Sequence, residues 1–333
     1  MKPSNLSKAL KHLVAIKRPC FIWGPPGVGK SDIVGQVAKD MKLELKDVRL
    51  SLMDPTDLKG FPAPGKIGTK AVMSWLQPDF LPTKGKGILF LDELNAAPQA
   101  VQAAAYQLIL NRKIGDYTLP EGWSIIAAGN RTTDRSVVHA QPAALANRFI
   151  HIDAEVDVED WYDYACTIGV SDETRAYIRY RPKNLCVDKI DPGMRAFPTP
   201  RSWVFADQIM SDKNMPFEIQ IDLLRGTIGN GVAEEYIGFL HDIKSLPNID
   251  KILIAPDNVN VPTSPSVIYA LISALETRTS ATNFATVMRY VKRLSKEFEI
   301  VYVSSVVKSN DAITETKAFI EWARENRSVL TGK

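Results

Sequence analysis

The stretch GPPGVGKS, residues 24–31, has the residue types and the spacing needed to hold a phosphate group. It follows the pattern G-x-x-x-x-G-K-[ST] of nucleotide phosphate-binding loops. Its glycines let the backbone curl until successive N–H groups point inward at an anion. Lys30 brings a compact positive charge for the β- and γ-phosphates, and Ser31 brings a hydroxyl as a Mg²⁺ ligand. We expect nucleotide contacts from the loop and the residue after it: Gly24, Pro25, Pro26, Gly27, Val28, Gly29, Lys30, Ser31 and Asp32.

The segments on either side of this loop fit the elements that must position it. Residues 20–23 form a short apolar run typical of a buried strand. After the loop, apolar residues recur at helical spacing, and the N-terminal end of that helix would face the phosphates. Strand, loop and helix is the order in which this motif occurs. An earlier amphipathic helix is indicated by Leu6, Leu10, Leu13 and Val14.

Two later strand ends carry polar side chains suited to nucleotide hydrolysis. The apolar run 87–91 ends at Asp92, which is placed to hold Mg²⁺, and Glu93 is placed to deprotonate an attacking water. Asn130 follows a buried strand predicted at residues 123–128, where its amide would lie between the γ-phosphate and the water; it is also an ordinary residue for a turn. The chain has no Asn-Lys-x-Asp guanine-reading motif, which favours ATP over GTP.

Two arginines are candidates for contacts with phosphate. Arg148 precedes a short strand predicted at residues 149–152, where it would be exposed and able to reach the γ-phosphate of a neighbouring subunit. An isolated surface salt bridge is the alternative interpretation. Arg201 follows Thr199-Pro200 at the start of a predicted helix, where its charge opposes the helix dipole. A phosphate is therefore its expected partner.

The alternation of strands and helices predicts the fold class α/β. We expect a P-loop NTPase αβα sandwich with a five-stranded parallel sheet in residues 1–154, including a second strand at 47–51. Proline and glycine interrupt the pattern near 54–86, which predicts an insertion of loop or hairpin character. Residues 155–333 are predicted to be all-helical, although 298–307 is β-branched and ambiguous. One segment with helical periodicity places Trp161, Tyr164, Ala165 and Ile168 on a single face. Further helical segments are expected at 201–212, 216–228, 265–278, 282–295 and 313–326.

Length and composition fit a cytoplasmic, two-domain globular protein of 333 residues, with 45% hydrophobic and 24% charged residues. The net charge of +3 gives no reason to expect nucleic acid or a membrane surface as a partner. Three unclustered cysteines suggest a reducing compartment. Four histidines show no metal-ligand spacing. We see neither a signal-type N-terminus nor a membrane-spanning stretch.

The ordered set of motifs resembles an AAA+ ATPase of the MoxR type. That set is GPPGVGKS, ILFLDELN, IIAAGN, ALANRF and FPTPRSW, and it extends over residues 20–205. The resemblance implies a five-stranded αβα core followed by an all-helical lid. It also implies roles for particular residues: Lys30 and Ser31 in Walker A, Asp92 and Glu93 in Walker B, Asn130 as sensor 1, Arg148 as a finger acting in trans, and Arg201 as sensor 2.

Two further stretches resemble the clade of AAA+ proteins that carries an insert in helix 2. Residues 52–60 look like the MoxR segment before that insert, which would occupy residues 61–80 and face a pore. Residues 112–122 look like a hairpin before sensor 1, and Arg112 and Arg135 would be additional inter-subunit arginines. The resemblance implies a hexameric remodelling ATPase that uses ATP and Mg²⁺, paired with a von Willebrand factor A-domain protein.

Two other functions use the same core. A motor or loader acting on nucleic acid would need a basic stripe, but the chain is nearly balanced in charge and its aromatic residues are not interleaved with Lys or Arg runs. A nucleotide-gated assembly scaffold with vestigial hydrolysis would have no need of a catalytic base at Glu93. A remodelling ATPase is therefore the function that we expect.

Overall fold

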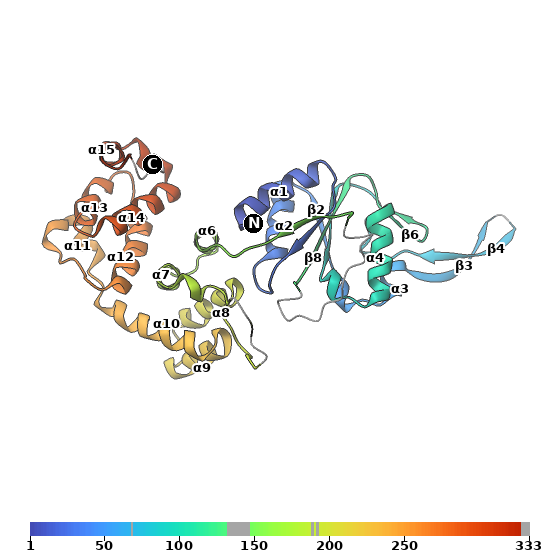
Figure 1. Ribbon diagram of the computed structural model, residues 1–333, viewed down its shortest axis with the longest axis horizontal. Coiled ribbons are helices and arrows are strands. Elements are labelled where there is room, and N and C mark those ends of the chain that lie inside the picture. Colours follow the sequence, from blue (N-terminus) through green and yellow to red (C-terminus); the bar gives the residue numbers. More distant parts are fainter. Residues whose placement is uncertain (68, 132–146, 188–189, 191–192, 328–333) are drawn as a thin grey trace. The chain divides into compact units, whose positions relative to one another are not determined.

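The computed structural model describes all residues except 68, 132–146, 188–189, 191–192 and 328–333 (Figure 1). The chain forms two compact units. The first contains Met1–Trp161 and short later segments, among them Thr199–Arg201, and the second contains most of the chain from Tyr162 onward.

The first unit is built on a five-stranded parallel sheet with the strand order β2-β5-β8-β1-β9. This confirms the predicted fold class. The buried strands β5 and β8 lie next to each other, so their C-terminal ends and that of β1 meet at one edge of the sheet. The strands are β1 (Cys20–Trp23), β2 (Glu44–Arg49), β5 (Gly87–Asp92), β8 (Trp123–Gly129) and β9 (Ile150–Asp153).

Helices cover both faces of this sheet, as Figure 1 shows. On one face, α1 (Pro3–Ala15) and α2 (Lys30–Asp40) pack on side chains that include Ile22 and Phe90. On the other, α4 (Gln99–Asn111) packs on alternate residues of the same strands, such as Leu89. Successive strand residues point to opposite faces, so near-continuous apolar strands supply both cores.

The insertion predicted near residues 54–86 is a short helix and a β-hairpin. Helix α3 (Pro55–Lys59) has Asp54 as its N-cap in a capping box. An antiparallel hairpin of β3 (Phe61–Ile67) and β4 (Lys70–Leu76) follows, and it projects from the unit in Figure 1. A second, small hairpin pairs β6 (Lys113–Ile114) with β7 (Tyr117–Thr118), within the stretch predicted to form one.

The second strand differs from the prediction of residues 47–51. Strand β2 runs over Glu44–Arg49, and Leu50–Leu52 is a turn of 3-10 helix. The strand begins earlier because its backbone pairs with the whole length of β5, from Glu44 opposite Gly87 to Arg49 opposite Asp92. Pairing with a neighbour therefore extended the strand through charged residues that carry no apolar signal.

Within the described residues of the second unit, the regular elements are all helices. Residues 298–307 lie within α14 and are not a strand, because Tyr302, Val303 and Val306 are buried at helical spacing. Helices α7, α10 and α11 had not been predicted. The helices of this region are α6 (Val158–Thr167), α7 (Asp172–Tyr180), α8 (Pro200–Ser211), α9 (Phe217–Ile228), α10 (Asn230–Asp242), α11 (Ile249–Ile254), α12 (Pro265–Arg278), α13 (Phe284–Val291), α14 (Lys296–Ser309) and α15 (Lys317–Glu325).

Helix α6 buries only half of the apolar face predicted for it. Trp161 and Ala165 are buried, whereas Tyr164 and Ile168 are exposed. Helical spacing shows which side chains share a face but not how far the neighbouring helices extend over it. Within the residues that the structure describes, no helix is both long and apolar enough to cross a bilayer.

A buried polar network joins α7, α12 and α14 in the second unit. The guanidinium of Arg179 donates to Glu276 Oε2 at 3.4 Å and to Ser305 Oγ at 2.8 Å. Tyr162 donates to the same carboxylate at 2.8 Å, and Ser309 donates to its other oxygen at 2.9 Å. A buried carboxylate needs such donors because burial otherwise penalises its charge.

Candidate functional site

The phosphate-binding loop lies between β1 and α2, as its sequence predicted. Gly27 and Gly29 have φ angles of 78° and 87°, in the left-handed region where a side chain is strained. Helix α2 begins at Lys30, so its free N–H groups face the loop. Val28 is buried, and Asp32 is exposed in the first helical turn.

The ammonium group of Lys30 is buried and held within this loop. Its Nζ donates to the carbonyl oxygens of Gly24 at 2.6 Å and Pro25 at 3.0 Å. It also donates to Asn130 Oδ1 at 3.0 Å. These contacts bring together two residues that are far apart in the sequence and that were both predicted to face the γ-phosphate.

Ser31 and Asp92 are also in direct contact. The Ser31 hydroxyl donates to Asp92 Oδ2 at 2.8 Å, and the Glu93 N–H donates to Asp92 Oδ1 at 2.9 Å. A hydroxyl and a carboxylate side by side are the oxygen donors that Mg²⁺ takes in nucleotide sites, with water and phosphate completing the shell. The pair therefore fits the predicted metal site. Elsewhere in the described chain, no group of three or more His, Cys, Asp or Glu residues is arranged to hold a metal.

Glu93 has a strained backbone and a side chain held by a residue that we had not predicted. Its φ of 54° lies in the left-handed region, which costs about 1–2 kcal/mol for a residue with a side chain. Its carboxylate accepts a short hydrogen bond from Ser51, which follows β2. Because β2 and β8 flank β5 on opposite sides, this bond draws the carboxylate away from Asn130.

The acidic groups around β5 affect one another. Burial raises the pKa of the Asp47 carboxyl on β2, and the nearby charge of Asp92 raises it further. A cation bound at Asp92 would weaken the repulsion between the Asp47 and Asp92 carboxylates, since it would offset the negative charge of Asp92.

Asn130 is positioned by its backbone as well as by Lys30. Asn95, buried just after β5, donates through Nδ2 to the Asn130 carbonyl at 2.7 Å. A Cβ at Gly129 would lie 2.0 Å from Asn95 Oδ1. The glycine therefore leaves the room in which Asn95 reaches the backbone beside the site.

The segment Thr199–Arg201 lies against the phosphate-binding loop. A Cβ at Gly27 would lie 2.8 Å from Thr199 Oγ1 and 2.9 Å from Thr199 Cβ. The backbone N–H of Arg201 donates to the Gly27 carbonyl at 3.3 Å. The Arg201 side chain is exposed. Its expected partner, a phosphate, stays a prediction.

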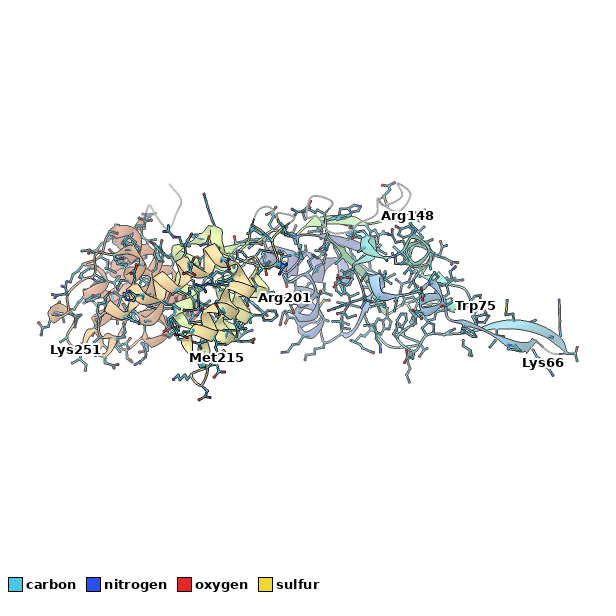
Figure 2. The ribbon with its side chains drawn as sticks, turned by 90° about the horizontal axis from the view of Figure 1, so that it is seen from below. Lys66, Trp75, Arg148, Arg201, Met215 and Lys251 are labelled. Atoms are coloured by element: carbon cyan, nitrogen blue, oxygen red, sulfur yellow. The ribbon has the colours of Figure 1, made fainter. Side chains whose placement is uncertain are left out.

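Arg148 lies on the outside of the first unit, apart from Arg201 (Figure 2). Among the residues that the structure describes, it pairs with no acidic group. Arg112, by contrast, donates to the Pro120 and Trp123 carbonyls, both at 2.8 Å, and so fastens the base of the β6–β7 hairpin. Arg135 lies outside the described residues.

The structure thus gathers Lys30, Ser31, Asp92, Glu93 and Asn130 at adjoining strand ends, and brings Arg201 to the loop by its backbone. Sequence reasoning missed the parts played by Ser51, Asn95 and Thr199. All three lie in stretches already singled out, at the end of the second strand, in ILFLDELN and in FPTPRSW, but nothing in these stretches indicates which side chains they would contact. Their types are too common in turns and strand ends to be singled out without the fold.

Comparison with known proteins agrees with the fold. Residues 19–149 match the family described as AAA domain (dynein-related subfamily). Midasin from Giardia intestinalis is 29% identical over 175 residues, which are 49% of this chain and 4% of that protein. The chain therefore corresponds to a small part of this relative.

Similar solved structures have low sequence identity. The Thermotoga maritima RuvB Holliday junction branch migration motor is 17% identical, with a TM-score of 0.41 over 87% of this chain and 85% of its own. A candidate ATPase from Cytophaga hutchinsonii is 13% identical, with a TM-score of 0.40 over 68% and 81%. Because these scores are low, the assignment depends on the strand order, the loop and the family match. Residues 19–149 are therefore similar to AAA domains of the dynein-related subfamily, and they contain the phosphate-binding loop and strands β1, β2, β5 and β8 of the parallel sheet.

Proposed function

We propose that this protein binds ATP with Mg²⁺ and hydrolyses it to remodel or activate a partner protein. The observation that carries the proposal is the set of direct bonds between Lys30, Asn130, Ser31 and Asp92, at the adjoining ends of β1, β5 and β8. Ligands bind at this edge of an open α/β sheet.

Each residue of the set has a task in this reaction. Lys30 and the loop N–H groups hold the phosphates, and Ser31 with Asp92 would hold Mg²⁺. The metal, when bound, offsets negative charge on the phosphates. Glu93 accepts a proton from the attacking water, and Asn130 orients that water through its amide.

The resting contacts of the site are exchanged when nucleotide binds. Lys30 gives up the Gly24 and Pro25 carbonyls for phosphate oxygens, which are stronger acceptors because they are charged. Glu93 leaves Ser51 and turns toward the other side of β5. Hydrolysis thus requires side chains of the site to rearrange.

We further propose a ring in which sites are shared between subunits. Its support is the exposed Arg148, which pairs with no acidic group among the described residues, together with the resemblance to MoxR-type ATPases. Arg148 would reach the γ-phosphate on the neighbour, and Arg201 would report that phosphate to the C-terminal helices. By the same resemblance we propose a hexamer, a partner with a von Willebrand factor A domain, and a cytoplasmic location, which the three free cysteines suit.

A subunit-mixing experiment tests the shared site. Glu93→Gln and Arg148→Ala are purified separately and each is expected to hydrolyse ATP at a small fraction of the wild-type rate. After mixing under conditions that allow exchange, activity should return. In the mixture, an active site would then combine the intact Glu93 of an Arg148→Ala subunit with the intact Arg148 of a neighbouring Glu93→Gln subunit.

The control is a second variant, Arg324→Ala, used in place of the Arg148→Ala variant. It removes an exposed arginine of the second unit, and this variant should hydrolyse ATP at the wild-type rate. Energy transfer between fluorescently labelled subunits verifies exchange. If exchange is complete and the mixture stays inactive, Arg148 does not act in trans. If the wild type itself fails to hydrolyse ATP, the proposed reaction is wrong.

A further inference from the structure

The β3–β4 hairpin has two unlike edges, because prolines lie on only one of its strands. Pro62 pairs with Trp75 and Pro64 with Met73. A proline cannot donate a backbone hydrogen bond, so these cannot be the pairs that exchange two bonds across the hairpin. Backbone groups at these positions therefore point outward, away from the partner strand.

The outer edge of β3 therefore has few backbone N–H donors. Two of its three outward positions are proline, and this is how proteins block strand addition. The outward positions of β4, by contrast, are Ala71, Met73 and Trp75, each with an N–H and a carbonyl group. In the part of the chain that the structure describes, no third strand pairs with this edge.

The side chains around the open edge are apolar and positively charged. Phe61 and Leu76 face each other across the hairpin and are 67% and 62% exposed, and Met73 is 68% exposed on the opposite face. Lys66 and Lys70 lie toward the outer end; Figure 2 shows Lys66 there and Trp75 at the inner end. Residues 58–78 contain three lysines and no acidic residue.

We propose that the open edge of β4 binds an extended, acidic and apolar segment of the partner protein by adding it as a third strand. Backbone hydrogen bonds to Ala71 and Met73 would give the binding its direction, and the exposed apolar side chains would pack on alternate residues of the segment. Lys66 and Lys70 would attract its carboxylates.

The charge of the hairpin favours this occupant over two others. A second copy of the hairpin would bring two more lysines, Lys66 and Lys70, and no compensating acid. Nucleic acid would match the lysines but would leave the exposed Met73 and Leu76 side chains in contact with phosphate and water. The proposal deepens the remodelling function, since it names the class of segment on which the ATPase would act.

Equilibrium binding of defined peptides to the full chain tests the proposal without ATP hydrolysis. The probe is a fluorescein-labelled ten-residue peptide that alternates valine with glutamate, followed by anisotropy. Two companion probes replace glutamate by lysine, or carry backbone N-methyl groups on the edge that would face β4. At low salt we expect the acidic peptide to bind about tenfold more tightly than either companion, since charge attraction and edge hydrogen bonds are each lost in one of them.

Variants of one position separate the backbone from the side chain. Met73→Pro removes an outward N–H and should weaken binding about tenfold, because one net hydrogen bond and its alignment are lost. Met73→Leu keeps the N–H and an apolar side chain, and binding should stay within about twofold. Lys66→Glu with Lys70→Glu should reverse the preference between acidic and basic peptides.

Several results would overturn the proposal. These are equal binding of the N-methylated peptide, full competition by a single-stranded oligonucleotide, or self-association of the wild type that Met73→Pro abolishes. The N-methylated probe needs no protein variant, so an unfolded variant leaves the test intact. ATP hydrolysis of the wild type is measured separately, and its absence would remove the remodelling function without affecting peptide binding.

Discussion

Removing the hydroxyl of Ser51 tests whether the resting position of Glu93 limits ATP hydrolysis. In the structure this hydroxyl holds the Glu93 carboxylate on the β2 side of β5, whereas Lys30 and Asn130 lie on the other side. Ser51→Ala releases the carboxylate without changing its charge or its backbone. We therefore expect basal hydrolysis to rise.

The size of the rise follows from the bond that is lost. A hydrogen bond to a charged group contributes about 1.5–3 kcal/mol, and each 1.4 kcal/mol is about tenfold in a population. If the released form of Glu93 is the one that reacts, the turnover number should rise by about tenfold and at most by about a hundredfold. The backbone strain at Glu93 is the same in both proteins and does not enter this difference.

The assay is steady-state phosphate release at saturating ATP. Ser51→Thr keeps the hydroxyl and should stay within about twofold of the wild type. The double variant Ser51→Ala with Glu93→Gln should remain inactive, which would show that the gain passes through Glu93. An unchanged or lower rate in Ser51→Ala, with nucleotide affinity retained, would refute the reasoning and make Ser51 an aid to the reaction.

Three further predictions concern the loop, the second unit and a buried thiol. Gly27→Ala should lower the affinity for a fluorescent ATP analogue about tenfold, because its Cβ meets Thr199 at a positive φ, and Thr199→Gly should restore part of the loss. Glu276→Ala should destabilise the second unit by about 3–5 kcal/mol in denaturant unfolding, since it leaves the buried charge of Arg179 without this carboxylate; a loss below about 1 kcal/mol would contradict this. Burial raises the pKa of Cys20 to about 12, so a maleimide should not label it in the folded protein from about pH 7 to 9, whereas unfolding should expose it to the reagent.

The core of the site could be predicted from the sequence because local patterns specify it. The motif from Gly24 to Ser31 predicts a strand before it and a helix after it. The strand that ends at Asp92 and Glu93 can be recognised from its apolar residues and its two terminal acidic residues alone. The C-terminal ends of parallel strands meet at one edge, so their convergence with Asn130 follows from the fold class.

Other features depend on contacts between distant parts of the chain. Ser51 and Glu93 are 42 positions apart, and nothing in either neighbourhood indicates that their side chains touch. The helix at Lys296–Ser309 contains β-branched residues whose local preference is for strands, and it forms because Val303 and Val306 are buried against other helices. Such tertiary effects have no local signal.

The unlike edges of the β3–β4 hairpin give any cyclic assembly of this chain a handedness. In a ring, the copies meet head to tail, so the β4 edge of one hairpin can meet only the β3 edge of the next. Pro62 and Pro64 leave that edge with few N–H donors. Neighbouring hairpins therefore cannot join through backbone hydrogen bonds into a closed barrel around the axis of the ring. Each copy would keep its own open strand, and all of them would face the same way around the circle.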